Sequence, residues 1–259
     1  MSEIVLKAEN LKKTFTLSRK QQKLDKTTSK KKVAVDGLSF TARKGEIYGL
    51  LGPNGAGKTT TLRMLATLIK ADEGDATVAG YSVSKEADMV RTKIGFLTSE
   101  LKPDEFFTPS YLFDFFSNLQ KVDEQVRDER KKDLFSRFGI DEFQETKIAD
   151  LSTGMKQKVS IAVSLVHAPE VIIFDEPTNG LDVLTAKSVT DFLLELKARG
   201  KTILLSTHIF SLVEKICDRV GIIIDGKMAL EEDVKTLVQD KCLEDVFFDL
   251  YAERKGGTK

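Results

Sequence analysis

The sequence is poor in several residue types and lacks one altogether. Its 259 residues include two cysteines, two histidines, five prolines and no tryptophan. Two cysteines are too few for a disulfide framework or a cysteine-based zinc cluster. Lys and Arg number 40, and so do Asp and Glu, which makes the formal net charge zero. That balance argues against a protein whose whole surface binds nucleic acid or anionic lipid.

Long apolar runs are missing as well. No stretch approaches the roughly 20 apolar residues that a membrane-spanning helix needs. Residues 1–13 lack the basic-then-apolar order of a secretory signal. With 41% hydrophobic and 31% charged residues, the composition is that of a folded chain. We therefore expect a cytosolic globular protein that does not itself cross a membrane.

Short, nearly continuous apolar runs alternate with helical patterns. Such runs are typical of strands buried on both faces of a parallel sheet, so the alternation predicts an α/β fold. The expected strands are Ile47–Leu51, Ile94–Leu97, Val171–Phe174, Thr202–Ser206 and Val220–Ile224. Apolar residues at helical spacing predict a helix over Lys58–Ile69 and another around residues 159–166.

Three segments depart from this alternation. Residues 19–32 hold seven basic residues and one acid, which predicts an exposed loop between two strands. It is either a basic finger for nucleic acid or anionic lipid, or a solvated insertion, the simpler interpretation. Strand patterns vanish over about 99–155, which indicates an inserted helical subdomain. After a tight turn at 225–227, residues 231–259 have a helical pattern, with Leu243, Val246, Phe247 and Leu250 on one face.

A phosphate-binding loop follows the first of the expected strands. Residues 52–59 fit the pattern G-x-x-x-x-G-K-[ST], and a helix is expected to begin at Lys58. Glycines let backbone N–H groups converge on an anion, Lys58 adds a charge for the β- and γ-phosphates, and the Thr59 hydroxyl is suited to Mg²⁺. The nucleotide-binding residues expected here are Gly52, Pro53, Asn54, Gly55, Ala56, Gly57, Lys58, Thr59 and Thr60.

Two carboxylates end the strand over Val171–Phe174. Asp175 and Glu176 would project at the carboxyl edge of the sheet, where parallel sheets bind their ligands. Next to a phosphate loop, Asp175 is expected to hold Mg²⁺ through water, and Glu176 to activate the attacking water as general base. The pair therefore predicts hydrolysis of a nucleoside triphosphate.

Three further motifs follow in a diagnostic order. Residues 151–157 (Leu-Ser-Thr-Gly-Met-Lys-Gln) precede the acidic strand, residues 180–182 (Gly-Leu-Asp) follow it, and residues 206–208 (Ser-Thr-His) come last. Over about residues 1–230 the chain resembles the ATP-binding subunits of ABC transporters. The first motif is similar to the LSGGQ signature, with Thr153 and Met155 in place of a glycine and the glutamine. Within the family it resembles the exporter branch for drugs, polysaccharides and sodium, and looks most like the sodium-extrusion ATPases.

The resemblance implies a fold and an assembly. The fold is a P-loop NTPase with a RecA-like parallel core, an N-terminal antiparallel β subdomain and the helical subdomain. Two copies would dimerise head to tail, with ATP closed between one phosphate loop and the partner's signature. Ser152 and Gly154 would then contact the partner's γ-phosphate, and Asp182 would belong to the D-loop of the nucleotide site. His208 would contact the γ-phosphate and orient Glu176, so the catalytic residues implied are Lys58, Glu176 and His208.

Two positions depart from the family pattern, one in its spacing and one in its residue type. Phe15 matches the aromatic residue that stacks on adenine, although the basic segment separates it from Lys58. Alternatively it is a strand-end aromatic packed on its own sheet. Ser99, followed by Glu100, stands where the family has a glutamine that contacts Mg²⁺ and water. We expect one of the two to sense the metal through water. For His167, which lies in a turn, we favour a structural role.

The resemblance also implies partners. A separate integral-membrane permease would receive the work of ATP hydrolysis, with this chain at the cytoplasmic face of the membrane and no nucleic acid bound. Aromatic residues between Phe106 and Phe116 would either form a groove for a helix of that permease or the core of the helical subdomain. The alternative functions are an ATP-switched nucleic-acid or ribosome-associated protein of the same family, and a phosphate-loop kinase, which would leave the signature and His208 without a purpose.

Overall fold

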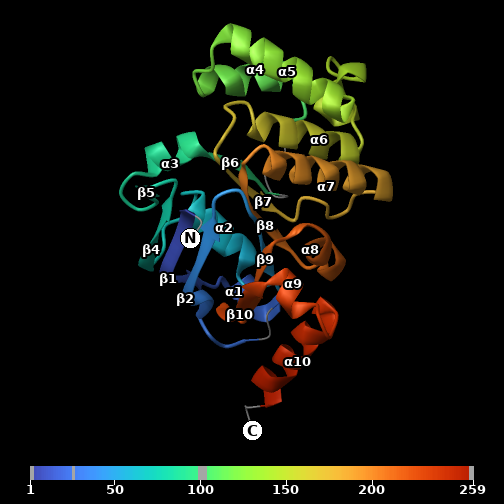
Figure 1. The fold of residues 1–259 in the computed structure, drawn as a ribbon. Helices are drawn as coiled ribbons and strands as arrows, with labels where there is room; N and C mark the ends of the chain where they lie inside the picture. Colours follow the sequence, from blue (N-terminus) through green and yellow to red (C-terminus); the bar gives the residue numbers. More distant parts are fainter. Residues whose placement is uncertain (1–2, 25–26, 99–103, 257–259) are drawn as a thin grey trace.

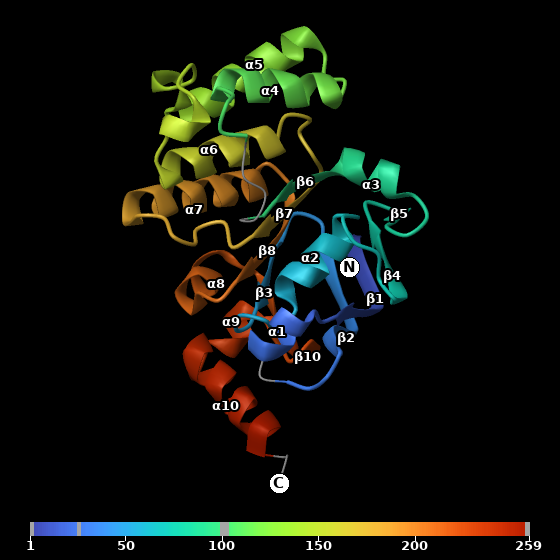
Figure 2. The ribbon, with the colours of Figure 1, turned by 180° about the vertical axis from the view of Figure 1, so that it is seen from behind.

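The computed structural model describes residues 3–24, 27–98 and 104–256. It contains a four-stranded antiparallel sheet and a six-stranded sheet, with helices arranged around them (Figures 1 and 2). The strands are β1 (Ile4–Thr16), β2 (Lys31–Arg43), β3 (Ile47–Leu51), β4 (Glu73–Val78), β5 (Tyr81–Ser82), β6 (Ile94–Leu97), β7 (Val171–Asp175), β8 (Thr202–Thr207), β9 (Arg219–Ile224) and β10 (Lys227–Asp233).

Helices account for most of the remaining chain. The α-helices are α1 (Arg19–Leu24), α2 (Lys58–Leu65), α3 (Ala87–Lys93), α4 (Pro109–Leu119), α5 (Glu124–Phe138), α6 (Thr153–Ser164), α7 (Val183–Ala198), α8 (Phe210–Ile216), α9 (Val234–Leu237) and α10 (Leu243–Gly256), and the 3₁₀ helices are η1 (Ile140–Glu142) and η2 (Ile148–Asp150). No helix in the described part of the chain is long and apolar enough to cross a membrane.

The six-stranded sheet has the order β10-β9-β3-β8-β7-β6. Strands β9, β3, β8, β7 and β6 run parallel, and β10 pairs antiparallel with β9 through the tight turn at residues 225–227. All five strands expected from apolar runs are present, and β3 and β6 have the predicted bounds. The α/β prediction is therefore confirmed, because each run is buried in a sheet covered on both faces.

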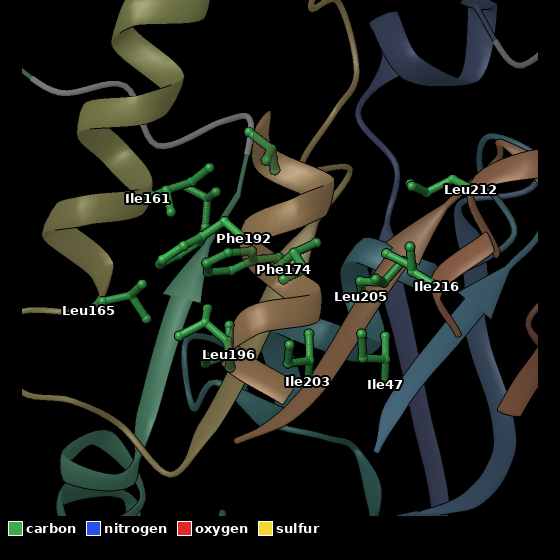
Figure 3. Close-up of a cluster of buried hydrophobic side chains, with 14 of the residues drawn as sticks. Ile47, Ile161, Leu165, Phe174, Phe192, Leu196, Ile203, Leu205, Leu212 and Ile216 are labelled. Carbon is green, nitrogen blue, oxygen red and sulfur yellow. The ribbon is translucent and has the colours of Figure 1, made fainter. Parts of the chain in front are cut away.

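The two faces of this sheet carry two separate apolar cores. Ile47 and Leu51 of β3 belong to one core, whereas Tyr48 and Leu50 belong to the other. The alternation follows from the two-residue period of a strand. Helices α6, α7, α8 and α10 cover the first face, as the close-up of that core shows in part (Figure 3). Helix α2 and the antiparallel sheet β2-β1-β4-β5 cover the second.

The helical subdomain lies at one end of the molecule, with α10 at the other (Figures 1 and 2). Residues 104–164 contain helices and no strand in the described part of the chain. The expected aromatic stretch is divided in two. Phe113 is fully buried and packs edge-on against Phe135 of α5, at 5.4 Å between ring centroids. The exposed members are Phe106, Tyr111, Phe115 and Phe116.

Three local predictions were wrong. Residues 19–24 form helix α1 instead of a loop, because they are strong helix formers and Ser18 and Gln21 make reciprocal capping bonds at its start. Helix α2 ends at Leu65 and not at Ile69, and Thr67 takes a positive φ of 61°. Strand β10 continues to Asp233, where we expected helix from about residue 231. The tail beyond it does dock on the core, through buried Leu243 and Phe247.

Candidate functional site

The phosphate loop joins the end of β3 to the start of α2. Two of its glycines are required by close contacts. A Cβ on Gly52 would lie 2.3 Å from the carbonyl oxygen of Ile223, and one on Gly57 would lie 2.4 Å from that of Ala34. Gly57 also has a φ of 104°, which disfavours any L side chain. The loop is therefore held between β2 and β9, with its backbone free to curl at the start of a helix.

The turn between β9 and β10 supports the loop from outside. The amide of Gly226 donates to the carbonyl of Ala56 at 3.0 Å, and the amide of Asp36 donates to the carbonyl of Gly226 at 2.9 Å. Within the loop, the Ala56 amide bonds the carbonyl of Pro53 at 3.2 Å. Asn54 and Gly55 are exposed at its tip, and Thr59 and Thr60 are half-buried in the first turn of α2.

Lys58 reaches back across the loop. Its Nζ donates to the carbonyl of Gly52 at 2.6 Å and to that of Pro53 at 3.3 Å, and its side chain is 6% exposed. The same Nζ lies 3.5 Å from Oε1 of Glu176. Burial lowers the pKa of Lys58, and the nearby Glu176 carboxylate opposes that shift. An anion in the loop would relieve the burial cost of this ammonium group.

Asp175 is the last residue of β7 and is held on both oxygens. The hydroxyl of Ser206, on β8, donates to Oδ1, and the hydroxyl of Thr98 donates to Oδ2 at 3.3 Å. The Asp175 side chain is buried. We did not predict Thr98 or Ser206 as partners of this carboxylate. The signal was available in outline, since both follow or end strands expected in the same parallel sheet, β6 and β8, which flank β7.

Glu176 sits in strained backbone between Lys58 and His208. Its φ is 52°, in the left-handed region that residues with a Cβ rarely occupy. Oε1 of Glu176 lies 3.0 Å from Nδ1 of His208, which follows β8 directly. The backbone amide of Glu176 donates to the carbonyl of Ser206 at 3.1 Å. The structure thus brings the three expected catalytic side chains together, because Lys58 and His208 each lie within 3.5 Å of the Glu176 carboxylate.

Phe15 lies near the end of β1 and is 39% exposed. It pairs across the ladder with Lys32 of β2, two residues before Ala34, whose carbonyl abuts Gly57. The Nζ of Lys13 lies 5.9 Å from the centroid of its ring. The role of Phe15 in stacking on adenine stays a prediction, and its partly exposed ring is available for such a contact.

The signature motif is built on the other face of the sheet. Ser152 caps α6 and accepts a bond from the Met155 amide at 3.2 Å. A Cβ on Gly154 would lie 3.2 Å from Oγ1 of Thr185 and 3.7 Å from Oδ2 of Asp182, the N-cap of α7. Gly154 and Asp182 are therefore neighbours, and helices α6 and α7, at whose starts they lie, pack against the face of the sheet opposite α2.

Asp182 uses both carboxylate oxygens locally. Oδ1 accepts from the amides of Leu184 and Thr185 at 3.0 Å, and Oδ2 accepts from the Thr185 hydroxyl at 2.7 Å. These bonds lower the pKa of Asp182, the Thr185 hydroxyl foremost. The geometry makes Asp182 a helix cap that also packs against the signature.

Ser99 and Glu100 lie outside the described residues. The other two expected Mg²⁺ ligands, Thr59 and Asp175, are described by the structure and offer a hydroxyl and a carboxylate. Oxygen donors of this kind, few in number, fit a cation that keeps several waters and binds substrate phosphates. In the described part of the chain, no cluster of three or more His, Cys, Asp or Glu side chains is placed to hold a metal by itself.

His167 behaves as a structural residue. Its Nε2 lies 3.0 Å from the carbonyl of Ile94, and its buried Nδ1 has no hydrogen-bond partner among the described residues. Burial lowers the pKa of this imidazole, and the cations of Arg130 and Lys201 add to the effect. The neutral ring therefore fits the site better than the charged one.

A glycine-rich loop opening α2, a buried Asp175 and an adjacent Glu176 at the edge of a parallel sheet define a P-loop nucleoside triphosphatase. The family model for ABC transporters matches residues 35–179, more than half of the chain. The chain belongs to the ABC transporter family and is one of its ATP-binding ATPase subunits.

Two curated relatives show the range of the likeness. The ABC transporter ATP-binding protein NatA of Bacillus subtilis is 38% identical over 220 residues, which are 84% of this chain and 89% of NatA. The daunorubicin/doxorubicin resistance ATP-binding protein DrrA of Streptomyces peucetius is 37% identical over 76% of this chain and 60% of DrrA.

Solved structures agree with the fold. The ATP-binding subunit of an ABC transporter superposes with a TM-score of 0.82 at 25% identity, covering 95% of this chain and 99% of that one. The ATP-binding cassette MJ0796, solved as a dimer in a post-hydrolysis state with ADP and Pi, superposes with a TM-score of 0.78 at 24% identity, covering 88% and 98%. The expected RecA-like core with an antiparallel β subdomain and a helical subdomain is therefore confirmed.

Proposed function

We propose that this chain is the motor of an ABC exporter, which hydrolyses ATP at the cytoplasmic face of a membrane to drive efflux through a separate integral-membrane subunit. The observation that carries the proposal is the approach of Lys58 and His208 to the same carboxylate, Glu176, beside the phosphate loop. Sodium is the cargo we favour, because residues 95–99 and the aromatic stretch after them resemble the sodium-extrusion members of the family.

The hydrolysis step uses groups that the fold has already oriented. The backbone N–H groups of residues 52–59 and the ammonium of Lys58 bind the phosphates. Glu176 accepts a proton from the attacking water, and His208, 3.0 Å from its Oε1, holds the carboxylate and contacts the γ-phosphate. Lys58 leaves Glu176 for the phosphates when ATP binds, which frees the carboxylate to act as the base.

Magnesium supplies charge compensation for the phosphates when it is bound with ATP. Thr59 and Asp175 are the residues that would hold it, Asp175 through water. Ser206 and Thr98 fix the orientation of the Asp175 carboxylate, so its oxygens need not reorganise when the metal arrives. Ser99 or Glu100 remains our candidate for sensing the metal.

We infer a head-to-tail homodimer as the working state. The phosphate loop and the signature lie on opposite faces of one sheet, so a second chain must supply the signature to each nucleotide. Val183 and Leu184, directly after Asp182, are 84% and 81% exposed. Two large apolar side chains so exposed beside the signature support a covered surface in the assembly.

The membrane subunit would dock on the exposed aromatics of the helical subdomain. Tyr111 and Phe115, both on α4, are each 48% exposed, and the centroids of their rings lie 6.2 Å apart. Phe107 stacks on Tyr111 at 4.5 Å, which stiffens this surface. An apolar stripe on a helix suits a helix-in-groove contact with a cytoplasmic segment of the permease.

The test joins activity to transport. The chain is co-expressed with its membrane partner, purified from detergent extract, and placed in vesicles to follow ATP-dependent movement of radioactive sodium. Wild type should move sodium and hydrolyse ATP. Glu176→Gln should bind ATP with unchanged affinity and lose at least about a hundredfold in hydrolysis.

Each arm of this test answers one question. ATP hydrolysis without sodium movement would remove sodium and leave the motor. RNA or DNA in place of a membrane protein in the purified complex would favour the alternative, an ATP-switched nucleic-acid protein, whose one support is the basic composition of residues 19–32. Wild-type hydrolysis in Glu176→Gln would refute the catalytic assignment.

A further inference from the structure

Helix α10 contacts two elements that adjoin the nucleotide site. Its start lies against α8, where the Leu243 amide donates to Oε1 of Glu214 at 2.7 Å. Leu243 and Phe247 are buried there, and the ring centroids of Phe247 and Phe210 lie 5.3 Å apart. Because α8 begins two residues after His208, α10 is fixed to the segment that carries this histidine.

The other end of α10 is tied to the turn between β9 and β10. Nη1 of Arg254 donates to the carbonyl of Ile224 at 3.1 Å, and Nη2 donates to the carbonyl of Met228 at 2.8 Å. These carbonyls stand on either side of residues 225–227. The second lies at a register shift in the β9–β10 ladder, between Met228 and Leu230. One guanidinium group therefore bonds both sides of the turn through two separate N–H donors.

The same turn supports the phosphate loop. The Gly226 amide donates to the carbonyl of Ala56 at 3.0 Å. The carbonyl of Ile223, just before the turn, lies where it would meet a Cβ added to Gly52, at 2.3 Å. Two consecutive positive φ angles, 50° at Asp225 and 78° at Gly226, are those of a tight two-residue hairpin turn, which has little freedom of its own. A shift of the turn therefore moves the backbone of the phosphate loop, whose N–H groups bind the phosphates in the proposed function.

We propose that Arg254 is a positioning residue for nucleotide binding, which holds the β9–β10 turn, and through it the phosphate loop, in the conformation that accepts the phosphates. The inference rests on the nucleotide site of the proposed function and adds a residue that acts on it from outside the loop. The anchor on α8 is part of this role. An exposed arginine on a loose segment samples many rotamers, whereas buried Leu243 and Phe247 fix the helix from which Arg254 reaches the turn.

A purely structural role for Arg254 is the alternative, in which its two bonds only fasten α10 to the sheet. The two roles differ in their coupling to nucleotide. If docking of Arg254 favours the loop conformation that binds nucleotide, then bound nucleotide must favour docking of Arg254 by the same factor. A bond that only fastens the helix gives no such coupling. The affinity for nucleotide and the hydrogen exchange of α10 amides therefore distinguish the two roles.

The first experiment combines calorimetric titration of the full chain with ADP and Mg²⁺ with the kcat and KM of ATP hydrolysis. We expect Arg254→Ala to weaken the affinity for ADP and to raise KM about fivefold each, with kcat within about twofold, because the catalytic side chains are unchanged. Arg254→Lys should lie between this variant and the wild type, since one ammonium group replaces two separate N–H donors. Arg199→Ala is the matched control, because exposed Arg199, at the end of α7, bonds Glu195 of its own helix. It should match the wild type.

The second experiment follows hydrogen exchange of the backbone amides of residues 243–254 by mass spectrometry. Saturating ADP should slow this exchange about fivefold in the wild type and leave it unchanged in Arg254→Ala. Buried Leu243 and Phe247 keep the helix docked in the variant, so the lost response would report the loss of the Arg254 bonds and not an unfolded tail.

A wild type that binds no nucleotide would overturn the nucleotide site of the proposed function and this inference with it. A wild type that binds ADP, with an Arg254→Ala variant that binds it equally well, would overturn the positioning role alone. Faster exchange of α10 in that variant at unchanged affinity would assign Arg254 to fastening the helix. An equal loss of affinity in Arg199→Ala, or a fall in kcat at unchanged KM in Arg254→Ala, would also contradict the positioning role.

Discussion

The side-chain amide of Gln157 donates to the carbonyl of Pro177 at 2.9 Å, which ties helix α6 to the loop directly after Glu176. A second tie lies close by, where Gly154 packs against Thr185 and Asp182. In the proposed dimer, α6 serves the nucleotide of the partner while Glu176 serves its own. We therefore predict that a displacement of Glu176 is transmitted to the second nucleotide of that dimer through these contacts.

Gln157→Leu tests this link. Removing the donor leaves the partly buried Pro177 carbonyl unpaired, which should lower the free energy of unfolding by about 1–2 kcal/mol. It should also lower the cooperativity of ATP hydrolysis, with the Hill coefficient falling towards one. Denaturant titration and initial rates over a range of ATP concentrations measure both.

Gln125→Leu provides the matched control. Gln125 is exposed and bonds only Glu129 on its own helix at its side chain in the described structure. We expect Gln125→Leu to change the free energy of unfolding by less than about 0.5 kcal/mol and to leave the cooperativity of ATP hydrolysis unchanged. Full cooperativity in Gln157→Leu would show that the bond is structural and carries no signal between sites.

The backbone strain at Glu176 gives a second prediction. At a φ of 52°, a residue with a Cβ pays a cost that glycine avoids. Glu176→Gly should therefore be about 1 kcal/mol more stable than Glu176→Ala, although both lose the catalytic carboxylate. Urea unfolding of the two variants measures the difference.

A helical position supplies the opposite expectation. At Asp133, exposed within α5, the glycine variant should be about 1 kcal/mol less stable than the alanine variant. The same order at residues 133 and 176 would contradict stored strain at Glu176.

The local elements were well predicted from sequence because their signals are local. A strand buried on both faces must be apolar at nearly every residue, and Ile47–Leu51 met that condition with the predicted bounds. Lys58 and Gly57 were equally visible, since their spacing along the chain is itself the motif. The acidic pair at Asp175 and Glu176 could be seen because it directly follows an apolar run in a chain that also has a phosphate loop.

What depends on strand order was not predicted. Thr98 and Ser206 bond Asp175 because β6 and β8 flank β7. The apolar sequence of a strand does not indicate which strands lie beside it in the sheet. The division of the aromatic stretch between buried Phe113 and exposed Tyr111 depends on which side of α4 meets α5. The helix at residues 19–24 was missed because its cap, Ser18, lay outside the segment defined by charge.

The phosphate loop offers a third prediction, from a matched pair of glycines. Gly55 and Gly57 both have positive φ, 82° and 104°, but an added Cβ meets nothing within 4 Å at Gly55 and the Ala34 carbonyl at 2.4 Å at Gly57. Gly55→Ala should lower the free energy of unfolding by about 1 kcal/mol, from backbone strain alone. Gly57→Ala should lower it further and weaken ATP affinity by at least about tenfold, because the loop must move away from β2. Equal affinities in a nucleotide-binding titration would contradict this account.

The last prediction concerns the pH dependence of stability at His167. Burial lowers its pKa below the usual 6.5, and in the part of the chain that the structure describes the buried Nδ1 has no partner to accept its proton. The unfolded chain therefore takes up this proton first as the pH falls through about 6.5, which favours unfolding until the folded pKa is reached. Stability from the neutral ring is present above the unfolded pKa and declines below it.

His167→Gln removes the titration while keeping an amide donor for the Ile94 carbonyl. Between pH 7 and about pH 5 the wild type should lose more free energy of unfolding than this variant in urea titrations. Parallel pH profiles for the two proteins would show that His167 does not titrate differently in the folded state.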